Sequence, residues 1–245
     1  MDVSGGNLAI WAVNNTSSLA TSSPNLLITE TTIPTQNYSL QPTALQKNGP
    51  LTLANSYFPT GLLSGLDGGD VRVLSATYAG GRLYATLGTD VVDSFGDNLS
   101  GGAYFVITPT FRAGVLSADA LRQGYLVVDR NNLLRPAIAV NADGNGAITF
   151  TLVGPDYFPS AAFVPFTNFA AAGPIQVAGP GAFPEDGFTG YPNNGFPVAG
   201  VARWGDYSTA MVASDGSIWM TTEYIPNSVR TSQANWGSYV MQYIP

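Results

Sequence analysis

The stretch at residues 207–224, YSTAMVASDGSIWMTTEY, contains the pattern that decides the fold of this chain. Two strand-like runs, residues 207–213 and 218–224, flank a turn at 214–217 that contains an Asp-Gly pair. Alternation of apolar and polar residues with a period of two is typical of strands that bury one face. Asp-Gly supplies the positive φ angles that hairpin turns of the right twist require. The stretch therefore predicts a β-hairpin.

The same pattern occurs twice earlier in the chain. The turns are Ala79-Gly80-Gly81 and residues 141–146, and the strands beside them are 71–78 with 82–87 and 136–140 with 147–153. Further strand-like runs follow the hairpins: 103–107, 123–128, 161–166, 175–178 and, after the last hairpin, 238–244. Antiparallel strands that recur in groups of four, with turn signals and no helical period, are typical of a β-propeller.

Nearer the N-terminus, residues 8–13 and 25–33 predict two strands joined by a polar loop. We expect them to be the later strands of a sheet whose first strands are absent. Residues 34–69 are rich in Pro, Gly and Asn and predict a long loop that covers a surface or shapes a site. The one helical candidate is short, residues 117–122, with Ser117 as its N-cap.

The expected architecture is a single all-β domain over residues 1–245, a partial β-propeller with three to four blades of four antiparallel strands. Its blade-like units are residues 7–33, 70–130, 135–180 and 203–245. So short a propeller leaves apolar blade faces and strand edges open. Either two chains form a homodimer that closes a ring of about six to eight blades, or residues 8–13 close against 238–244 in a small ring.

Composition limits the chemistry that is available. The 245 residues include no Cys and no His, which excludes disulfides, thiolate metal sites, His-based zinc sites and Ser-His-Asp catalysis. The net charge of −7 argues against non-specific binding to nucleic acid or to an anionic membrane. No run of about 20 apolar residues occurs, so no membrane span is predicted. We expect an extracellular or cell-surface protein from its loop-rich, weakly charged composition, although the first residues lack the pattern of a signal peptide.

Several motifs resemble a family of uncharacterised secreted bacterial proteins. They are Arg203-Trp204-Gly205-Asp206-Tyr207, Ser217-Ile218-Trp219, Glu223-Tyr224-Ile225, Asn235-Trp236-Gly237, Ile10-Trp11-Ala12, Asn15-Thr16-Ser17-Ser18-Leu19 and residues 157–162. The resemblance is to the C-terminal half of that family and covers nearly all of this chain. It implies a sialidase-like β-propeller and carries no activity with it. Family members often have a longer loop that contains Cys between the Glu-Tyr-Ile and Asn-Trp-Gly motifs. In this chain the corresponding loop, residues 226–234, is short and lacks Cys.

Charged residues recur where each predicted repeat begins. They are Asp70 and Arg72, then Arg135, then Arg203 and Asp206. In a propeller the first strand of each blade lines the axis, and ligands bind in the funnel where the adjoining loops meet. Arginine donates paired hydrogen bonds to carboxylates, phosphates or sugar hydroxyls, so these residues, with Trp204 and Tyr207, predict a site for carbohydrate or another small polar ligand. The alternative is a structural ion-pair network that holds the inner strands together.

Asp206 and Glu223 form the predicted catalytic pair. Strand alternation places Glu223 on the same face as Trp219 and Thr221. A carboxyl beside an aromatic ring can have a raised pKa and act as a general acid. With Asp206 it would support glycosidase-type hydrolysis without histidine. The alternative is an ordinary solvated acid on a strand.

Calcium is the one metal that the sequence leaves open. Asp143-Gly144-Asn145-Gly146 resembles the start of an EF-hand loop, but residue 154 is Gly where that loop needs Glu, so a turn is the better interpretation. Asp90, Asp93 and Asp97 with Asn98 either hold calcium through oxygen ligands or form a hydrophilic loop. We otherwise expect no metal and no cofactor.

Three functions remain open on the sequence alone. The leading hypothesis is a histidine-independent hydrolase of the glycosidase type that acts at the axial funnel. The second is a non-catalytic recognition module for extracellular glycans or partner proteins. The third is a calcium-dependent esterase or phosphotriesterase with its metal at the funnel.

Overall fold

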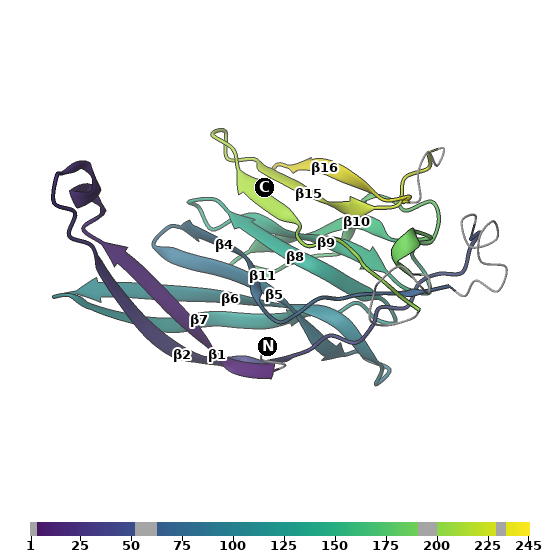
Figure 1. The fold of residues 1–245 in the computed structure, drawn as a ribbon, viewed down its shortest axis with the longest axis horizontal. Coiled ribbons are helices and arrows are strands. Elements are labelled where there is room, and N and C mark those ends of the chain that lie inside the picture. Colours follow the sequence, from purple (N-terminus) through teal and green to yellow (C-terminus); the bar gives the residue numbers. More distant parts are fainter. Residues whose placement is uncertain (1–3, 52–62, 191–199, 229–233) are drawn as a thin grey trace.

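The computed structural model of the chain describes residues 4–51, 63–190, 200–228 and 234–245 (Figure 1). In these ranges the chain forms β-strands, two short 3-10 helices and no α-helix, which confirms the prediction of an all-β chain. None of the helices in this described part is long and apolar enough to cross a membrane. The strands form four antiparallel sheets that follow one another along the sequence, together with one short parallel pair.

The first sheet is a long hairpin. Its strands are β1 (Ser4–Asn14) and β2 (Leu27–Ser39), and η1 (Thr16–Ala20) lies in the connection. These strands confirm the predictions for residues 8–13 and 25–33, but β2 continues to Ser39, so the loop predicted over 34–69 begins later. Residues 52–62 of that loop lie outside the described ranges.

The second sheet has four strands in the order β4-β5-β6-β7. They are β4 (Val73–Ala79), β5 (Arg82–Val92), β6 (Asn98–Arg112) and β7 (Val115–Leu126). The helix predicted at residues 117–122 is wrong, because this segment lies within β7. Its sequence SADALR suits a helix locally, but β7 pairs with β6 along its whole length, and strand pairing overrides local preference.

The third sheet is the centre of the molecule. It contains β8 (Asn132–Val140), β9 (Gly146–Val153), β10 (Ser160–Thr167), β11 (Ala170–Ala171) and β12 (Gln176–Gly179). Every residue of β8 and β9 is buried, because neighbouring sheets cover both faces. The Thr77 and Thr86 hydroxyls donate hydrogen bonds to the carbonyls of Ile138 and Pro136, at 3.0 and 3.1 Å. These bonds join the second and third sheets at the edge strand β8.

The fourth sheet contains β14 (Thr209–Val212), β15 (Ile218–Tyr224) and β16 (Gly237–Tyr243), which confirms a three-stranded last repeat. Before it, η2 (Phe188–Gly190) leads to β13 (Val201–Ala202), which pairs in parallel with β3 (Gly65–Leu66). Among the described strands β16 pairs only with β15 and β1 only with β2. The alternative in which residues 8–13 close against 238–244 is therefore wrong.

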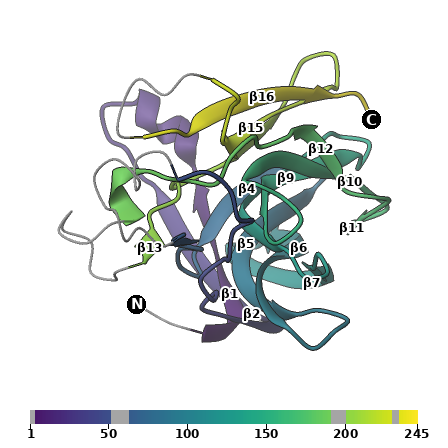
Figure 2. The same cartoon turned by 90° about the vertical axis from the view of Figure 1, so that its right-hand side faces the viewer.

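Apolar cores lie between successive sheets. Between the second and third sheets, Tyr84 and Tyr104 pack edge-on against Phe166 with ring centroids 5.9 and 5.5 Å apart. Other cores lie between the hairpin and the second sheet and between the third and fourth sheets. Burial of each large side chain contributes about 1.5–3 kcal/mol. The resulting stack is curled, and Figures 1 and 2 place the β1–β2 hairpin and the C-terminal sheet on opposite sides of it.

The predicted turn glycines have the expected backbone. Gly81, Gly144 and Gly216 have φ angles of 77°, 84° and 83°. Residues 141–145 and 213–217 form the same closed turn, in which the first N–H donates to the last carbonyl at 2.8 Å. The Asp143-Gly144 segment is thus a turn, as predicted. A side chain at these positions would be strained by the positive φ.

Candidate functional site

The segment in front of β4 holds the first predicted charged pair. Asp70 Oδ2 lies 2.7 Å from Arg72 Nε, and Asp70 Oδ1 accepts a hydrogen bond from the Arg72 backbone N–H at 3.0 Å. These bonds, chiefly the one to the Arg72 side chain, lower the pKa of the Asp70 carboxyl. The Arg72 side chain is exposed, whereas Asp70 is largely shielded. The carboxylate therefore anchors a guanidinium that faces solvent.

Arg135 forms the buried centre of the predicted site. It follows Leu134 in β8 at an irregularity of the pairing with β9, and its φ of 54° is one that residues other than glycine rarely adopt. Its Nε and Nη2 donate hydrogen bonds to the Trp204 carbonyl at 3.4 and 3.2 Å. Gly69 packs against the guanidinium, and a Cβ there would overlap Nη1. The irregular backbone thus directs Arg135 into the junction between β8, the segment before β4 and the segment before β14.

Trp204 belongs to the core below this junction. Its side chain is 1% exposed. The indole N–H donates to Thr151 Oγ1 at 3.2 Å, and the Thr151 hydroxyl donates to the Glu223 carbonyl at 2.8 Å. Trp204 was predicted to bind substrate, but its side chain is buried and has almost no surface for a ligand; its carbonyl holds Arg135, and its indole is linked through Thr151 to the Glu223 carbonyl.

Arg203 and Asp206 form an exposed ion pair above Trp204. Arg203 Nη2 lies 2.9 Å from Asp206 Oδ1 and 3.2 Å from Oδ2, and both side chains are more than half exposed. An exposed pair of this kind contributes about 0–1 kcal/mol to stability. Tyr207, the next residue, is also exposed. These side chains are therefore accessible to a ligand at little cost to the fold.

Glu223 is the partly buried acid of the junction. Gly205 lies against it, and a Cβ at position 205 would collide with the Glu223 carboxylate. Burial raises the pKa of Glu223; Arg135 opposes this rise and Asp206 adds to it. A carboxyl in this environment retains its proton to higher pH than an ordinary Glu, as a general acid requires.

The predicted site residues come from segments that meet around Arg135. Its guanidinium contacts Gly69, which precedes Asp70, and the carbonyl of Trp204, which lies between Arg203 and Asp206, while Glu223 lies against Gly205. We call this group the junction site and define it as Asp70, Arg72, Arg135, Arg203, Asp206, Tyr207 and Glu223.

Two residues that contribute to the junction site were not predicted from the sequence. Gly69 gives the Arg135 guanidinium its space, and Thr151 links Trp204 to Glu223. Gly69 precedes the charged run in a segment with many glycines, and Thr151 is one of several threonines in a strand. No local signal distinguishes either residue, because their roles come from contacts with distant segments.

Two of the three acids considered for calcium, Asp93 and Asp90, form hydrogen bonds within the protein. Asp93 accepts hydrogen bonds from the backbone N–H groups of Phe95, Asp97 and Arg130 at 2.8–2.9 Å. Asp90 instead bonds to Ser39. In the described part of the chain, no group of three or more His, Cys, Asp or Glu side chains could hold a metal ion.

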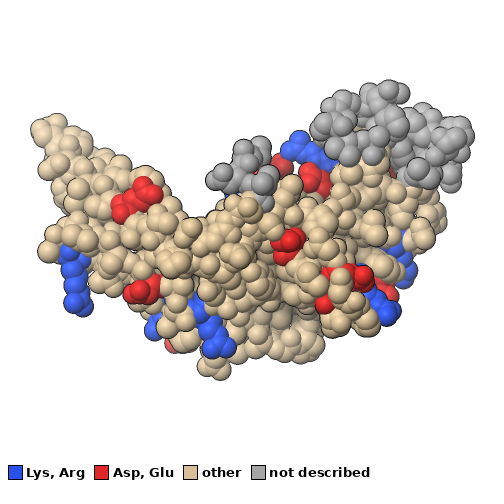
Figure 3. Space-filling view, turned by 90° about the horizontal axis from the view of Figure 1, so that it is seen from below, with Lys and Arg blue, Asp and Glu red and all other residues tan. Residues whose placement is uncertain are grey.

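Charged side chains are sparse and scattered on the face shown in Figure 3. Comparison of the chain with protein-family models, with curated proteins and with solved structures finds no match. The geometry of the junction site is therefore what indicates the function of the chain.

Proposed function

We propose that the chain is a histidine-independent hydrolase that cleaves glycosidic bonds at the junction site. The proposal is based on two carboxyl groups of the junction site that lie in different environments. Glu223 is partly buried with a raised pKa, while Asp206 is exposed and paired with Arg203. Such a difference in environment is what separates the acid from the carboxylate in glycosidases.

Each residue then has a defined role. The Glu223 carboxyl donates its proton to the leaving glycosidic oxygen, and the Asp206 carboxylate acts on the opposite side as base or nucleophile. The Arg72 and Arg203 guanidinium groups donate hydrogen bonds to ligand oxygens. Arg135, held by the Trp204 carbonyl, limits how far the pKa of Glu223 rises.

A second candidate is a recognition module that binds extracellular glycans without cleaving them. It is favoured by the exposure of Arg72, Arg203 and Tyr207, which offer two guanidinium groups and an aromatic ring to a ligand. Aromatic rings pack against the apolar faces of sugars, and arginine binds their hydroxyls. Both candidates agree with an extracellular or cell-surface location.

The architecture we propose is that of successive propeller blades completed by a second copy of the chain. The second and third sheets are each packed between two neighbouring sheets. In the described part of the chain, no sheet covers the outer face of the β1–β2 hairpin or the outer face of the β14–β16 sheet. Exposed apolar side chains occupy both: Trp11, Val13 and Ile28 on the hairpin, and Met211, Trp219 and Val240 on β14–β16. A head-to-tail partner would cover one face with the other.

The hydrolase proposal is tested with a panel of chromogenic glycosides. We expect turnover by the wild type and its loss in Asp206→Asn and Glu223→Gln. Glu30→Gln and Asp119→Asn are matched controls, because each removes one exposed carboxylate outside the junction site. The melting temperature of Asp206→Asn should stay within a few degrees of that of the wild type, because the ion pair that is lost is exposed.

Other outcomes separate the alternatives. Binding of an oligosaccharide without turnover, lost in Arg203→Met, would favour the recognition module. Ester or phosphotriester hydrolysis abolished by a calcium chelator would favour the third hypothesis. Turnover that survives both acid substitutions would contradict the proposed site.

A further inference from the structure

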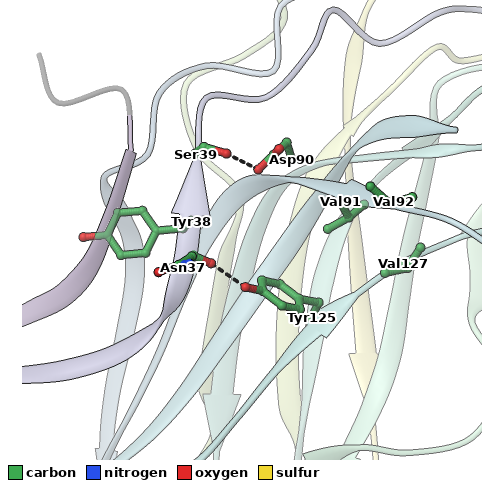
Figure 4. A pocket seen from close by; sticks show the side chains of 8 residues that line it. All are labelled: Asn37, Tyr38, Ser39, Asp90, Val91, Val92, Tyr125 and Val127. Carbon is green, nitrogen blue, oxygen red and sulfur yellow. Dashed lines mark hydrogen bonds between the residues drawn. The ribbon is translucent and has the colours of Figure 1, made fainter. Parts of the chain in front are cut away.

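A cavity lies where the end of β2 meets β5 and β7 (Figure 4). Its volume is about 410 Å³, within the range of about 300–1,000 Å³ typical of small-molecule sites. Its walls come from three strands that are distant in sequence, and none of the residues of the junction site lines it. We call it the hairpin cleft.

Hydrogen bonds fix β2 against β7 on one side of the hairpin cleft. The Gln36 backbone N–H donates to Gln123 Oε1 at 2.8 Å, and the Gln36 amide donates to the Gly124 carbonyl at 2.9 Å. The Tyr125 hydroxyl donates to the Asn37 carbonyl at 2.5 Å. These bonds hold the Tyr125 ring in place, so this wall exists before any ligand binds.

The other side of the cleft is held to β5. The Ser39 backbone N–H donates to Thr89 Oγ1 at 3.0 Å, and the Ser39 hydroxyl donates to Asp90 Oδ1. Thr89 Oγ1 also lies 3.3 Å from Asp90 Oδ1. Asp90 Oδ2 takes part in no hydrogen bond with the described residues, so it can accept one or two from a ligand.

The remaining surface of the cleft is apolar and accessible. Tyr125 and Val127 are each exposed over two fifths or more of their surface, and Val91 of β5, which lies on the same face of the sheet as Tyr125, is buried beside them. None of the residues that line the cleft is Lys or Arg. The pKa of the Tyr125 phenol is raised, first by burial and second by the negative charge of Asp90, so the charge of Asp90 acts on the side chains of the cleft. An anionic ligand would therefore be repelled.

We propose that the hairpin cleft binds a neutral sugar ring, as a recognition site independent of the junction site. The apolar C–H face of the ring packs on Tyr125 and Val127. Two adjacent hydroxyls donate hydrogen bonds to Asp90 Oδ2, which are charge-assisted and therefore the stronger polar contacts. A pyranose ring fits the volume of the hairpin cleft. Its C–H face and its hydroxyls match the apolar wall and the single carboxylate.

The test uses the methyl glycosides of glucose, galactose and mannose as neutral probes, with glucuronate and glucosamine as acidic and cationic probes. Saturation-transfer NMR detects binding, and titration calorimetry measures its affinity. We expect at least one neutral glycoside to bind in preference to both charged sugars. Asp90→Asn should weaken that binding by about tenfold or more, because hydrogen bonds to a charged group are lost.

A variant that fills the cleft gives a second, independent readout. Val127→Trp places a large ring in the cavity and should abolish the binding that Asp90→Asn weakens. Tyr78→Trp is the control, since Tyr78 is also exposed but lies outside the cleft. Circular dichroism and melting confirm that each variant is folded.

Several results would overturn the proposal. They are the absence of binding by every neutral probe, a preference for glucosamine or glucuronate, or neutral-sugar binding that neither Asp90→Asn nor Val127→Trp changes. Glu223→Gln separates the two sites: it should abolish hydrolysis at the junction site and leave binding in the hairpin cleft unchanged.

Discussion

Arg135 shows how one residue can organise a site built from three separate segments. Its positive φ places it in a sparsely populated backbone region, which costs about 1–3 kcal/mol and persists only where the surroundings impose it. The surroundings here are the glycine at 69 and the carbonyl of Trp204. Gly205 has the same function for Glu223, because the absence of a Cβ lets the carboxylate lie against the backbone.

The titration of Glu223 gives a prediction at this scale. Burial raises its folded-state pKa, so the stability that comes from its protonated form is complete below the ordinary pKa and is lost as pH rises through the raised pKa. Glu223→Gln removes this dependence. We expect the melting temperature of the variant to rise relative to that of the wild type as pH increases from the ordinary glutamate pKa of 4.5 through the raised pKa of Glu223.

Thermal melts across this pH range, with Glu30→Gln alongside, provide the measurement. Glu30 is exposed and should show no comparable gain. A difference between wild type and Glu223→Gln that stays constant with pH would mean that Glu223 titrates as an ordinary surface acid.

At the scale of elements, the joint between β9 and β15 depends on hydroxyl groups buried between sheets. Thr151 Oγ1 lies 3.1 Å from Thr222 Oγ1, and the Ser208 hydroxyl donates to Thr222 Oγ1 at 2.8 Å. Together with the Trp204 indole N–H, these hydroxyls form a network in which each group has a hydrogen-bond partner among the described buried residues. Such networks fix one relative position of two strands, because an unpaired buried polar group is costly.

Thr151→Val should therefore destabilise the protein more than its change in volume suggests. The substitution leaves the Trp204 N–H without its acceptor, which costs about 1–3 kcal/mol. Thr149→Val is the matched control, because Thr149 is equally buried but makes a single bond, to the Ala162 carbonyl at 3.0 Å. Urea unfolding of both variants measures the difference, and equal losses would show that the network adds nothing.

At the scale of the whole molecule, the uncovered faces at the two ends predict self-association. Apolar faces of this kind are a liability in a monomer, because they bind other sheets non-specifically. We expect light scattering to give about twice the chain mass of 25.6 kDa at about micromolar concentration. Trp219→Ser and Trp11→Ser should each shift the protein toward the monomer, whereas Tyr78→Ser should not. A monomeric wild type would contradict the proposed dimer.

The strands, their turns and the order of the sheets could be predicted from the sequence, because strand and turn propensities depend on neighbouring residues. Period-two alternation and Asp-Gly pairs are local, and they correctly predicted the hairpins around Gly81, Gly144 and Gly216. Local preference failed at residues 117–122, where pairing with β6 decides the conformation. The charged residues that begin each repeat were also visible in the sequence.

How those residues meet depends on the tertiary structure. It buried Trp204, directed Arg135 between two distant segments and placed the Glu223 carboxyl against Gly205. It also formed the hairpin cleft from β2, β5 and β7, which no local pattern connects. The physical reason is that burial, pKa and cavity shape come from contacts between residues far apart in the chain, whereas strand and turn propensities come from residues next to each other.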